Sequence, residues 1–176
     1  MKSYDYIIVG GGMTAEAAVS GIATTEPDAA IATFSKENYA PYWRPPLSKS
    51  LWQDKTVEDI WCGTTADNLD CVKNTTISSI DGDACTLTDT EGQIYEWGKL
   101  LLATGGTPRK LPGRQSENII YYRTLDDYYN LKTKTGKDNA RAVVLGAGFI
   151  GSEVDADLTM NGVHVTMILA QDGVGG

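Results

Sequence analysis

The stretch YIIVGGGMTAEAAVS, Tyr6 to Ser20, decides the fold of this chain. Its first four residues are apolar and predict a short buried strand that runs directly into glycines. The small residues that follow, among them Ala15 and Ala18, suit a helix pressed against a sheet. A second apolar run, AAIATF at 29–34, predicts the next strand. Strand, helix and strand in this order form a right-handed parallel unit.

The same pattern begins a second time near the other end of the chain. VVLGAGFIGSEVDADL, Val143 to Leu158, again places glycines between an apolar strand and a helix, and HVTMIL at 164–169 supplies the following strand. The repetition indicates an internal duplication of a strand-helix-strand unit and not a solenoid.

Each copy carries the glycine spacing of a dinucleotide-binding loop. The first glycine permits the tight turn, the second lets the backbone approach a pyrophosphate, and the third small residue lets helix and strand pack closely. The helix N-terminus then offers its amides and positive potential to the anion. Because each pattern follows a strand, opens a helix and leads to another strand, we predict two dinucleotide sites, the alternative being that one copy is only structural. The predicted loop positions are Gly10, Gly12, Met13, Thr14 and Ala15 in the first copy, and Gly146, Gly148, Phe149, Ile150 and Gly151 in the second.

Each site is expected to carry an acid about twenty residues further on, where it would accept a hydrogen bond from a ribose hydroxyl. Glu37, with Lys36 beside it, follows the second strand of the first copy. Asp172, with Gln171 beside it, follows the second strand of the other copy. A solvated turn carboxylate is the alternative for both acids, so the choice between NADH and NADPH stays open.

The segments between the two copies change character along the chain. Three prolines in NYAPYWRPPLSKSLW, 38–52, predict a rigid, extended excursion, and 56–68 is helical or irregular. Patterns of period two then predict strands, with DTEGQ as a hairpin turn. The apolar run at 100–103 is typical of a central parallel strand. The predicted later elements are strands at 75–80, 84–97 and 99–106, and a helix within 121–134 that turns Leu125 and Leu131 inward.

These patterns predict an α/β fold: a doubly wound, Rossmann-like parallel sheet with a β-meander, followed by the start of a second Rossmann-like unit. The glycine- and proline-rich stretch at 105–113 marks the boundary between a first nucleotide-binding domain, 1–113, and a second one that begins within 114–176. Two strands and one helix leave apolar surface exposed, so we expect a fragment of a longer chain. A truncated gene product and a chain completed by a partner are the alternatives.

Composition narrows the function classes. A formal charge of −8 opposes sequence-independent binding to nucleic acid or to anionic membranes. The sequence has no run of eighteen apolar residues, which excludes a visible membrane span, and the first apolar run leaves no room for a signal peptide. The three cysteines, Cys62, Cys71 and Cys85, are read as free thiols in a reducing cytoplasm, where we expect the protein to reside.

Five separated motifs together resemble one family. They are the two glycine loops, PYWRPPLSK at 41–49, LLATGGTPR at 101–109 and RTLDD at 123–127. The chain is similar over its whole length to the FAD-dependent pyridine-nucleotide oxidoreductases, in the branch of apoptosis-inducing factor and the ferredoxin, putidaredoxin and rubredoxin reductases. The resemblance implies that the first loop binds the pyrophosphate of FAD and the second that of NAD(P)H.

The resemblance also assigns residues around the flavin. Arg44 and Lys49 match residues that contact it, and Glu153 matches the glutamate that pairs with the lysine. A cation near the reactive edge of the ring would stabilise negative charge on reduced flavin, and a partner carboxylate would moderate it. A surface lysine and a first-turn acid are the structural alternatives. The remaining implied flavin contacts are Ala103, Thr104, Gly105 and Arg109, with Ile77 near the adenine through its main chain.

The resemblance implies an enzyme that passes hydride from NAD(P)H to FAD. Related branches need cysteines just after the first unit, and the stretch 35–51 has none, so electrons would leave the flavin directly. The acceptor would be an iron-sulfur protein or a small molecule such as oxygen or a quinone, although the acidic charge disfavours acidic partner proteins. A module that binds FAD or NAD(H) without turnover and a redox signalling protein like apoptosis-inducing factor are the alternatives; homodimerisation is left open.

Overall fold

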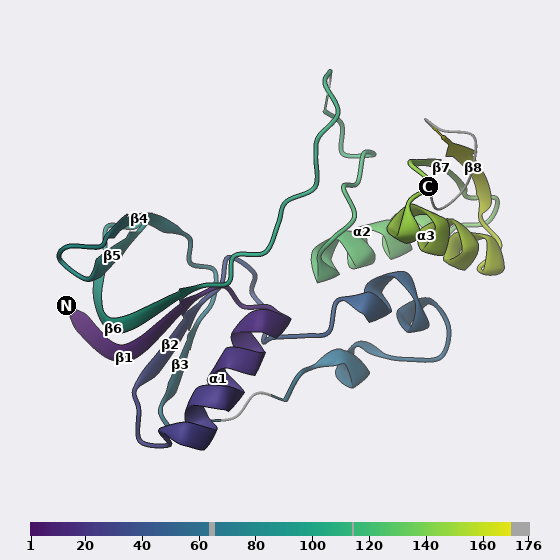
Figure 1. Ribbon diagram of the computed structural model, residues 1–176. Coiled ribbons are helices and arrows are strands. Elements are labelled where there is room, and N and C mark those ends of the chain that lie inside the picture. The colour runs from purple at the N-terminus through teal and green to yellow at the C-terminus, as the bar shows by residue number, and fades with distance from the viewer. Residues whose placement is uncertain (64–65, 114, 170–176) are drawn as a thin grey trace. The chain divides into compact units, whose positions relative to one another are not determined.

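The computed structural model describes residues 1–63, 66–113 and 115–169. Contacts divide the chain into two compact units (Figure 1). The first unit comprises Met1–Trp43 and Trp61–Gly106. The second unit comprises Arg44–Ile60 and the chain from Thr107 onward. From Arg44 onward the proline-rich excursion therefore leaves the first unit and belongs to the second, although it lies between two parts of the first unit in the sequence.

The first unit is built on a six-stranded sheet in the order β3-β2-β1-β6-β5-β4. Strands β1, β2, β3 and β6 run parallel, and β4 and β5 continue the sheet as an antiparallel meander. Helix α1 crosses over between β1 and β2 (Figure 1). The element bounds are β1 Lys2–Val9, α1 Met13–Thr25, β2 Ile31–Phe34, β3 Leu69–Val72, β4 Ile77–Asp81, β5 Thr86–Asp89 and β6 Ile94–Leu102.

Side chains alternate across β1 and fill a core on each face of this sheet. Ile8 packs in a cluster with Ala15 and Val19 of α1, whereas its neighbour Ile7 packs with Phe34 in a second cluster that also contains aromatic residues of β6. Successive residues of a strand point to opposite faces, so a continuous apolar run such as that of β1 marks a strand buried on both sides. This confirms the predicted parallel unit and the α/β class.

One strand of this unit was not predicted, and one predicted division between strands was wrong. LDCV, 69–72, forms β3 at the edge of the sheet, parallel to β2, although its polar residues had not indicated a strand. The strands predicted at 84–97 and 99–106 are not separated at Gly98, because β6 continues from Ile94 to Leu102. A Cβ added at Gly98 would lie 2.8 Å from the carbonyl oxygen of Asp5, so this glycine serves a close approach of backbone and does not end the strand.

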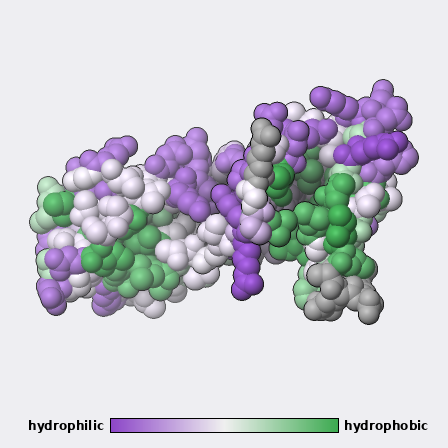
Figure 2. All heavy atoms as spheres, turned by 90° about the horizontal axis from the view of Figure 1, so that it is seen from above, coloured by the Kyte–Doolittle hydropathy of each residue, from purple (hydrophilic) through white to green (hydrophobic). Residues whose placement is uncertain are grey.

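The second unit contains a parallel pair of strands, β7 and β8, joined by α3. Helix α2 begins after Thr124, whose side chain and that of Asp127 form a reciprocal capping box. Leu125 is fully buried as predicted, and Leu131 is half-buried. Exposed hydrophobic residues of this unit include Val143 and Leu145 of β7. Figure 2 shows hydrophobic atoms, in green, at the surface of the chain. The bounds are α2 Leu125–Thr135, β7 Arg141–Leu145, α3 Phe149–Met160 and β8 His164–Ile168.

The stretch 44–52 is not extended, contrary to the prediction, whereas 56–60 lies in the stretch that was predicted to be helical or irregular. The two stretches form three short 3-10 helices, η1 Pro45–Ser48, η2 Ser50–Trp52 and η3 Val57–Ile60. Proline lacks an amide hydrogen and fixes its φ angle, which suits the first turn of a helix as well as an extended chain. The two adjacent prolines therefore start η1 where the sequence had predicted only irregular backbone.

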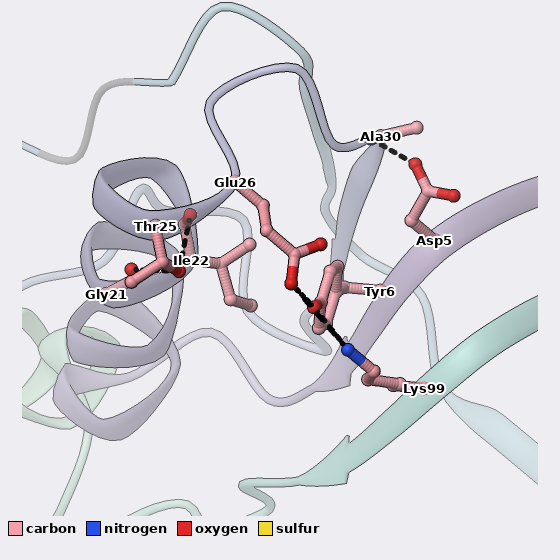
Figure 3. Close-up of polar contacts among 8 residues, drawn as sticks. All are labelled: Asp5, Tyr6, Gly21, Ile22, Thr25, Glu26, Ala30 and Lys99. Atoms are coloured by element: carbon pink, nitrogen blue, oxygen red, sulfur yellow. Dashed lines mark hydrogen bonds and ion pairs between the residues drawn. The ribbon is translucent and has the colours of Figure 1, made fainter.

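A polar network fastens the C-terminal end of α1 to the sheet (Figure 3). The Tyr6 hydroxyl donates to Glu26 Oε1 at 2.7 Å and accepts from Lys99 Nζ at 2.6 Å, so β1, β6 and the end of α1 are joined. Lys99 also lies 3.7 Å from Glu26 Oε1 and 4.7 Å from the centre of the Tyr6 ring.

Within the described ranges, every helix is too short or too polar to cross a membrane.

Candidate nucleotide-binding sites

The first glycine loop lies where three parallel strands end. Gly10 donates its amide to the carbonyl of Phe34 at the end of β2, and the amide of Ala103 donates to the carbonyl of Val9. Gly10 has a φ of +141°, and a Cβ there would lie 2.1 Å from the carbonyl oxygen of Ala103. A side chain is excluded by both the backbone conformation and the packing. The predicted tight turn is therefore present.

The helix that follows this loop begins without a side-chain cap. Gly12 is the N-cap in an extended conformation, and Glu16 makes the first backbone hydrogen bond, to the Gly12 carbonyl at 3.0 Å. The amides of the first turn, including those of Met13 and Thr14, precede that bond and are the groups that a helix offers to an anion. Ala15 is fully buried, which allows α1 to pack closely on the sheet.

Gly11 is a loop residue whose role the motif does not reveal. A Cβ added at Gly11 would meet the side chain of Ser35 at 2.5 Å, and Ser35 is itself buried. The middle one of the three consecutive glycines is thus required by the packing of Ser35, directly after β2. Only the fold brings residue 35 against residue 11, so the spacing of the motif carried no signal for it.

The residues after β2 lie at the same edge of the sheet. Glu37 Oε2 accepts a hydrogen bond of 2.6 Å from the Tyr42 hydroxyl, whereas Lys36 is exposed. The amide of Thr75 donates to the carbonyl of Ser35 at 2.8 Å, which places the start of β4, Ile77, close to this edge. The structure therefore gathers Lys36, Glu37 and Ile77 near the first loop. Their contact with a nucleotide stays a prediction.

The residues after β6 divide between the two units. Thr104 and Gly105 follow Ala103 in the first unit, and Gly105 has a φ of +67°, a conformation that favours glycine. Arg44 and Arg109 belong to the second unit. Arg44 donates to the carbonyl of Arg123 at 3.2 Å, so its guanidinium also fastens the excursion within that unit.

The second glycine loop repeats the geometry with a different close approach. Gly146 has a φ of +101° and donates to the carbonyl of Ile168 at the end of β8, at 3.0 Å. Gly148 is the extended N-cap of α3, again without a side-chain cap, and a Cβ there would meet nothing within 4 Å. A Cβ at Gly151 would lie 2.0 Å from the carbonyl oxygen of Gly146, so the first turn of α3 presses on the loop.

Two predicted residues of this loop are strongly exposed. Phe149 is 81% exposed and Ile150 is 51% exposed. Both would face solvent or a ligand at the mouth of the helix. Asp172 lies outside the described residues, so the predicted ribose contact stays a prediction.

The ion pair implied by the resemblance lies in the second unit. Lys49 Nζ donates to Glu153 Oε1 at 2.6 Å, and Ser48 Oγ donates to Glu153 Oε2 at 2.7 Å. These donors, Lys49 first, lower the pKa of the Glu153 carboxyl below its usual range, because they favour its charged form. The Lys49 side chain is 54% exposed, so its ammonium is accessible to a further anionic or electron-rich group.

Aromatic side chains hold the backbone around Lys49. The hydroxyl of Tyr122 and the indole Nε1 of Trp52 both donate to the carbonyl of Leu47. The Tyr128 hydroxyl donates to the carbonyl of Leu51 at 2.9 Å, and Trp52 packs edge-on against the Tyr128 ring. These contacts fix the turns on both sides of Lys49. The sequence did not indicate the contacts of Tyr122 and Tyr128, because their partners are more than seventy residues away.

The donor sets fit the pyrophosphate groups of two dinucleotides. Each loop presents an uncapped helix N-terminus beside glycines in conformations that exclude ordinary side chains, and the backbone at Gly148 faces open space. Oriented backbone amides at a helix start are the donors that phosphate groups require. The glycines thus fit the groups for which the two motifs predicted them.

The fold and the two loops define the chain as a dinucleotide-binding α/β protein of the Rossmann type. Residues 4–175 match the pyridine nucleotide-disulphide oxidoreductase family, and the chain belongs to this family. Members of the family use FAD and NAD(P)H. The resemblance deduced from the five motifs is therefore confirmed. Cys62, Cys71 and Cys85 are free thiols.

Three known proteins illustrate the similarity. Apoptosis-inducing factor 1 of Dictyostelium discoideum is 29% identical over 99% of this chain and 37% of its own. The monodehydroascorbate reductase of Solanum lycopersicum is 33% identical over 95% of this chain and 44% of its own. The crystal structure of the covalent putidaredoxin reductase–putidaredoxin complex matches with a TM-score of 0.84 and 31% identity, over 95% of this chain and 42% of the other. The chain thus spans less than half the length of these relatives.

Proposed function

We propose that this chain supplies the first nucleotide-binding elements of a reductase that passes hydride from NAD(P)H to FAD and then electrons to a separate acceptor. In this proposal the loop at Gly10–Ala15 binds FAD and the loop at Gly146–Gly151 binds NAD(P)H. The observation that carries the proposal is the ion pair of Lys49 and Glu153 in the same compact unit as the second loop. This ion pair supports the proposal because a charged group is expected beside a redox cofactor. A second glycine loop with only a structural role would not require such a pair.

The residues have distinct tasks in this function. The first-turn amides of α1 and α3 bind the pyrophosphates and so orient the two nucleotides. Lys49 keeps a positive charge where negative charge would develop, and Glu153 and Ser48 hold its ammonium in place. Bound FAD supplies the chemistry that accepts a hydride and returns electrons to an acceptor.

The acceptor is either an iron-sulfur protein or a small molecule. The covalent complex with putidaredoxin supports the first class, and the name of the monodehydroascorbate reductase supports the second. A net charge of −8 favours a small molecule or a partner that is not acidic, because like charges slow association. The stretch 35–51 has no cysteine, so the electrons would reach the acceptor without a dithiol relay from that segment.

The experiment is a titration of the purified chain with FAD, followed by anaerobic NADH and, separately, NADPH. We expect the visible flavin spectrum to be perturbed on binding and then to bleach, because hydride reaches the flavin. Protein that leaves the spectrum of FAD unchanged would refute the assignment of the first loop.

A second function is a nucleotide-binding module without turnover. The observation that favours it is the limited span of the chain, which covers 37% of one relative and 44% of another. Such a module would bind FAD, yet its spectrum would not bleach when NADH or NADPH is added. The same titration therefore separates the two functions.

A further inference from the structure

One face of α3 carries three polar residues that all contact the segment around Lys49. Glu153, Asp157 and Asn161 are spaced by four residues, which places them one above the other on the same side of a helix. Glu153 binds the side chains of Ser48 and Lys49. We call these three residues, Glu153 and Asp157 of α3 and its C-cap residue Asn161, the polar row.

Asp157 and Asn161, the other two residues of the polar row, contact the same segment further along the chain. The Gln53 side chain makes a hydrogen bond to the Asp157 carboxyl group. Asn161 Nδ2 donates to the carbonyl of Trp52 at 3.0 Å and to the carbonyl of Asp157 itself at 2.8 Å. The polar row thus meets the segment at residues 48 and 49 and again at 52 and 53.

Asp157 is a costly residue at this position. It is 4% exposed and lies between the buried side chains of Val154 and Leu158, and among the described residues its Oδ2 has no hydrogen-bond partner. Burial raises the pKa of its carboxyl group, the charge of Glu153 raises it further, and the hydrogen bond from Gln53 and the charge of Lys49 oppose the rise. A buried carboxyl with an unused oxygen destabilises a fold, so stability alone does not account for it.

Asn161 reaches Lys49 through the backbone of η2. The Trp52 amide donates to the carbonyl of Lys49 at 3.0 Å, so a fixed Trp52 restrains the main chain of Lys49. Trp52 is itself buried, with its ring against Tyr128. Two hydrogen bonds therefore connect the end of α3 to Lys49: one from the side chain of Asn161 to the carbonyl of Trp52, and one from the amide of Trp52 to the carbonyl of Lys49.

We propose that Asn161 and Asp157 are positioning residues that hold the 48–53 segment on α3 and so fix the ammonium of Lys49. The role of Lys49 beside a flavin rests on the proposed function, whereas the attachment of the segment does not. Because α3 begins at the second glycine loop, the polar row connects the helix that would bind NAD(P)H with the lysine that would lie beside FAD.

The first test is hydrogen exchange of the 176-residue chain, read by mass spectrometry on peptides that cover 47–55. Asn161→Ala removes the bond to Trp52, and Gln53→Ala removes the bond to Asp157 from the segment's side without altering α3. Asp155→Asn is the matched control, since Asp155 is on α3 but points away from the polar row. We expect exchange about fivefold faster in both test variants, as for the loss of one hydrogen bond. Exchange equal to that of Asp155→Asn would overturn the proposal.

The second test is the rate at which NADH reduces flavin bound to the protein. We expect Asn161→Ala to lower the rate at saturating NADH several-fold while the flavin content and the KM for NADH stay unchanged, a split that general loss of structure would not give. The loss should vanish in a Lys49→Ala background, because Asn161 acts through Lys49. An equal further loss in that background would overturn the proposal.

The two tests separate the proposal from the function on which it rests. Faster exchange in a chain that never binds flavin would leave the attachment standing and remove the proposed function. Normal flavin reduction with unchanged exchange in both test variants would agree with the proposed function and refute the positioning role of the polar row.

Discussion

The two strand-helix-strand units of this chain share a sequence pattern but differ in their surroundings. In the first, β1 lies between β2 and β6, and its Ile7 and Ile8 are buried. In the second, β7 has β8 as its neighbour among the described strands, and Val143 is 62% exposed. Both helices nevertheless begin at an extended glycine N-cap without a side-chain cap. The geometry of the phosphate loop is therefore local, whereas burial of the strands depends on what lies beside them.

The two loops also differ in the packing that excludes side chains at their glycines. In the first loop a Cβ at Gly10 would meet the carbonyl of Ala103, directly after β6, and a Cβ at Gly11 would meet Ser35, directly after β2. In the second loop Gly151 meets the carbonyl of Gly146 within the same loop. The same motif is thus locked by long-range packing in one unit and by local packing in the other.

The largest expected effect comes from the matched pair Gly10→Ala and Gly148→Ala. The methyl group of Gly10→Ala would lie in the backbone of Ala103, so we expect a loss of at least about 3 kcal/mol of stability, or failure to fold. Gly148→Ala points into open space and should change stability by less than about 1 kcal/mol. Urea unfolding followed by circular dichroism measures both. Similar losses in the two variants would break the comparison between the loops.

The next effect concerns the ion pair of the second unit. Lys49→Ala removes the cation held by Glu153, and we expect the reduction of bound flavin by NADH to slow by about a hundredfold with flavin content unchanged. Lys55→Ala, an exposed lysine of the same excursion, is the control and should leave the rate unaltered. A stopped-flow measurement of flavin absorbance would decide, and equal rates in the two variants would make Lys49 a surface lysine.

A smaller effect is expected from Asp157→Asn, and it depends on pH. Burial raises the pKa of Asp157 in the folded protein, so the folded state holds its proton to higher pH than the unfolded chain. The neutral form therefore supports the fold fully below the unfolded pKa, and this support is lost as the pH rises through the folded pKa. The asparagine side chain introduced by Asp157→Asn does not ionise, so the variant does not lose this stability as the pH rises.

Asp157→Asn should accordingly be more stable than the parent by about 1 kcal/mol at pH 8 and nearly equal to it at pH 3. Thermal unfolding at a series of pH values measures the difference. A stability difference independent of pH would mean that Asp157 stays neutral or is already compensated throughout.

The smallest effect is expected in the first unit, from Tyr6→Phe. The hydroxyl joins Glu26 and Lys99 at the surface, where hydrogen bonds and ion pairs contribute little (Figure 3). We expect the Tm to fall by less than about 3 °C. A larger fall would show that the stability of this unit depends on the network of Tyr6, Glu26 and Lys99 as well as on its two apolar clusters.

Much of the fold follows from local pattern, and the failures have a common cause. The hydrophobic run of β1, the glycines and the cap at Thr124 act within a few residues, so their elements were predicted from sequence. Strand β3 was missed because its apolar pattern is short and its order depends on pairing with β2. The 3-10 helices η1 and η2 were missed because proline suits the start of a helical turn as well as an extended chain.

The candidate site divides in the same way. Gly10, Gly12, Gly146 and Gly148 were identified by spacing, because phosphate loops use backbone conformation that few residues permit. Gly11 against Ser35 and Glu37 against Tyr42 were not identified, since each contact needs a turn or strand that brings distant atoms together. Within the polar row, the resemblance had implied the pairing of Glu153 with Lys49. Asp157 and Asn161 had no sequence signal toward their partners Gln53 and Trp52.

The sequence by itself determined that this protein has two glycine-led helix starts fit for dinucleotides, because those starts depend on conformations encoded within six residues. Only the tertiary structure decided that the segment carrying Lys49 folds in the same unit as the second loop and that Asp157 is buried beside it, whereas the resemblance had already implied the pair of Lys49 and Glu153. Such contacts are selected by the collapse of residues about a hundred positions apart, and no local preference specifies them.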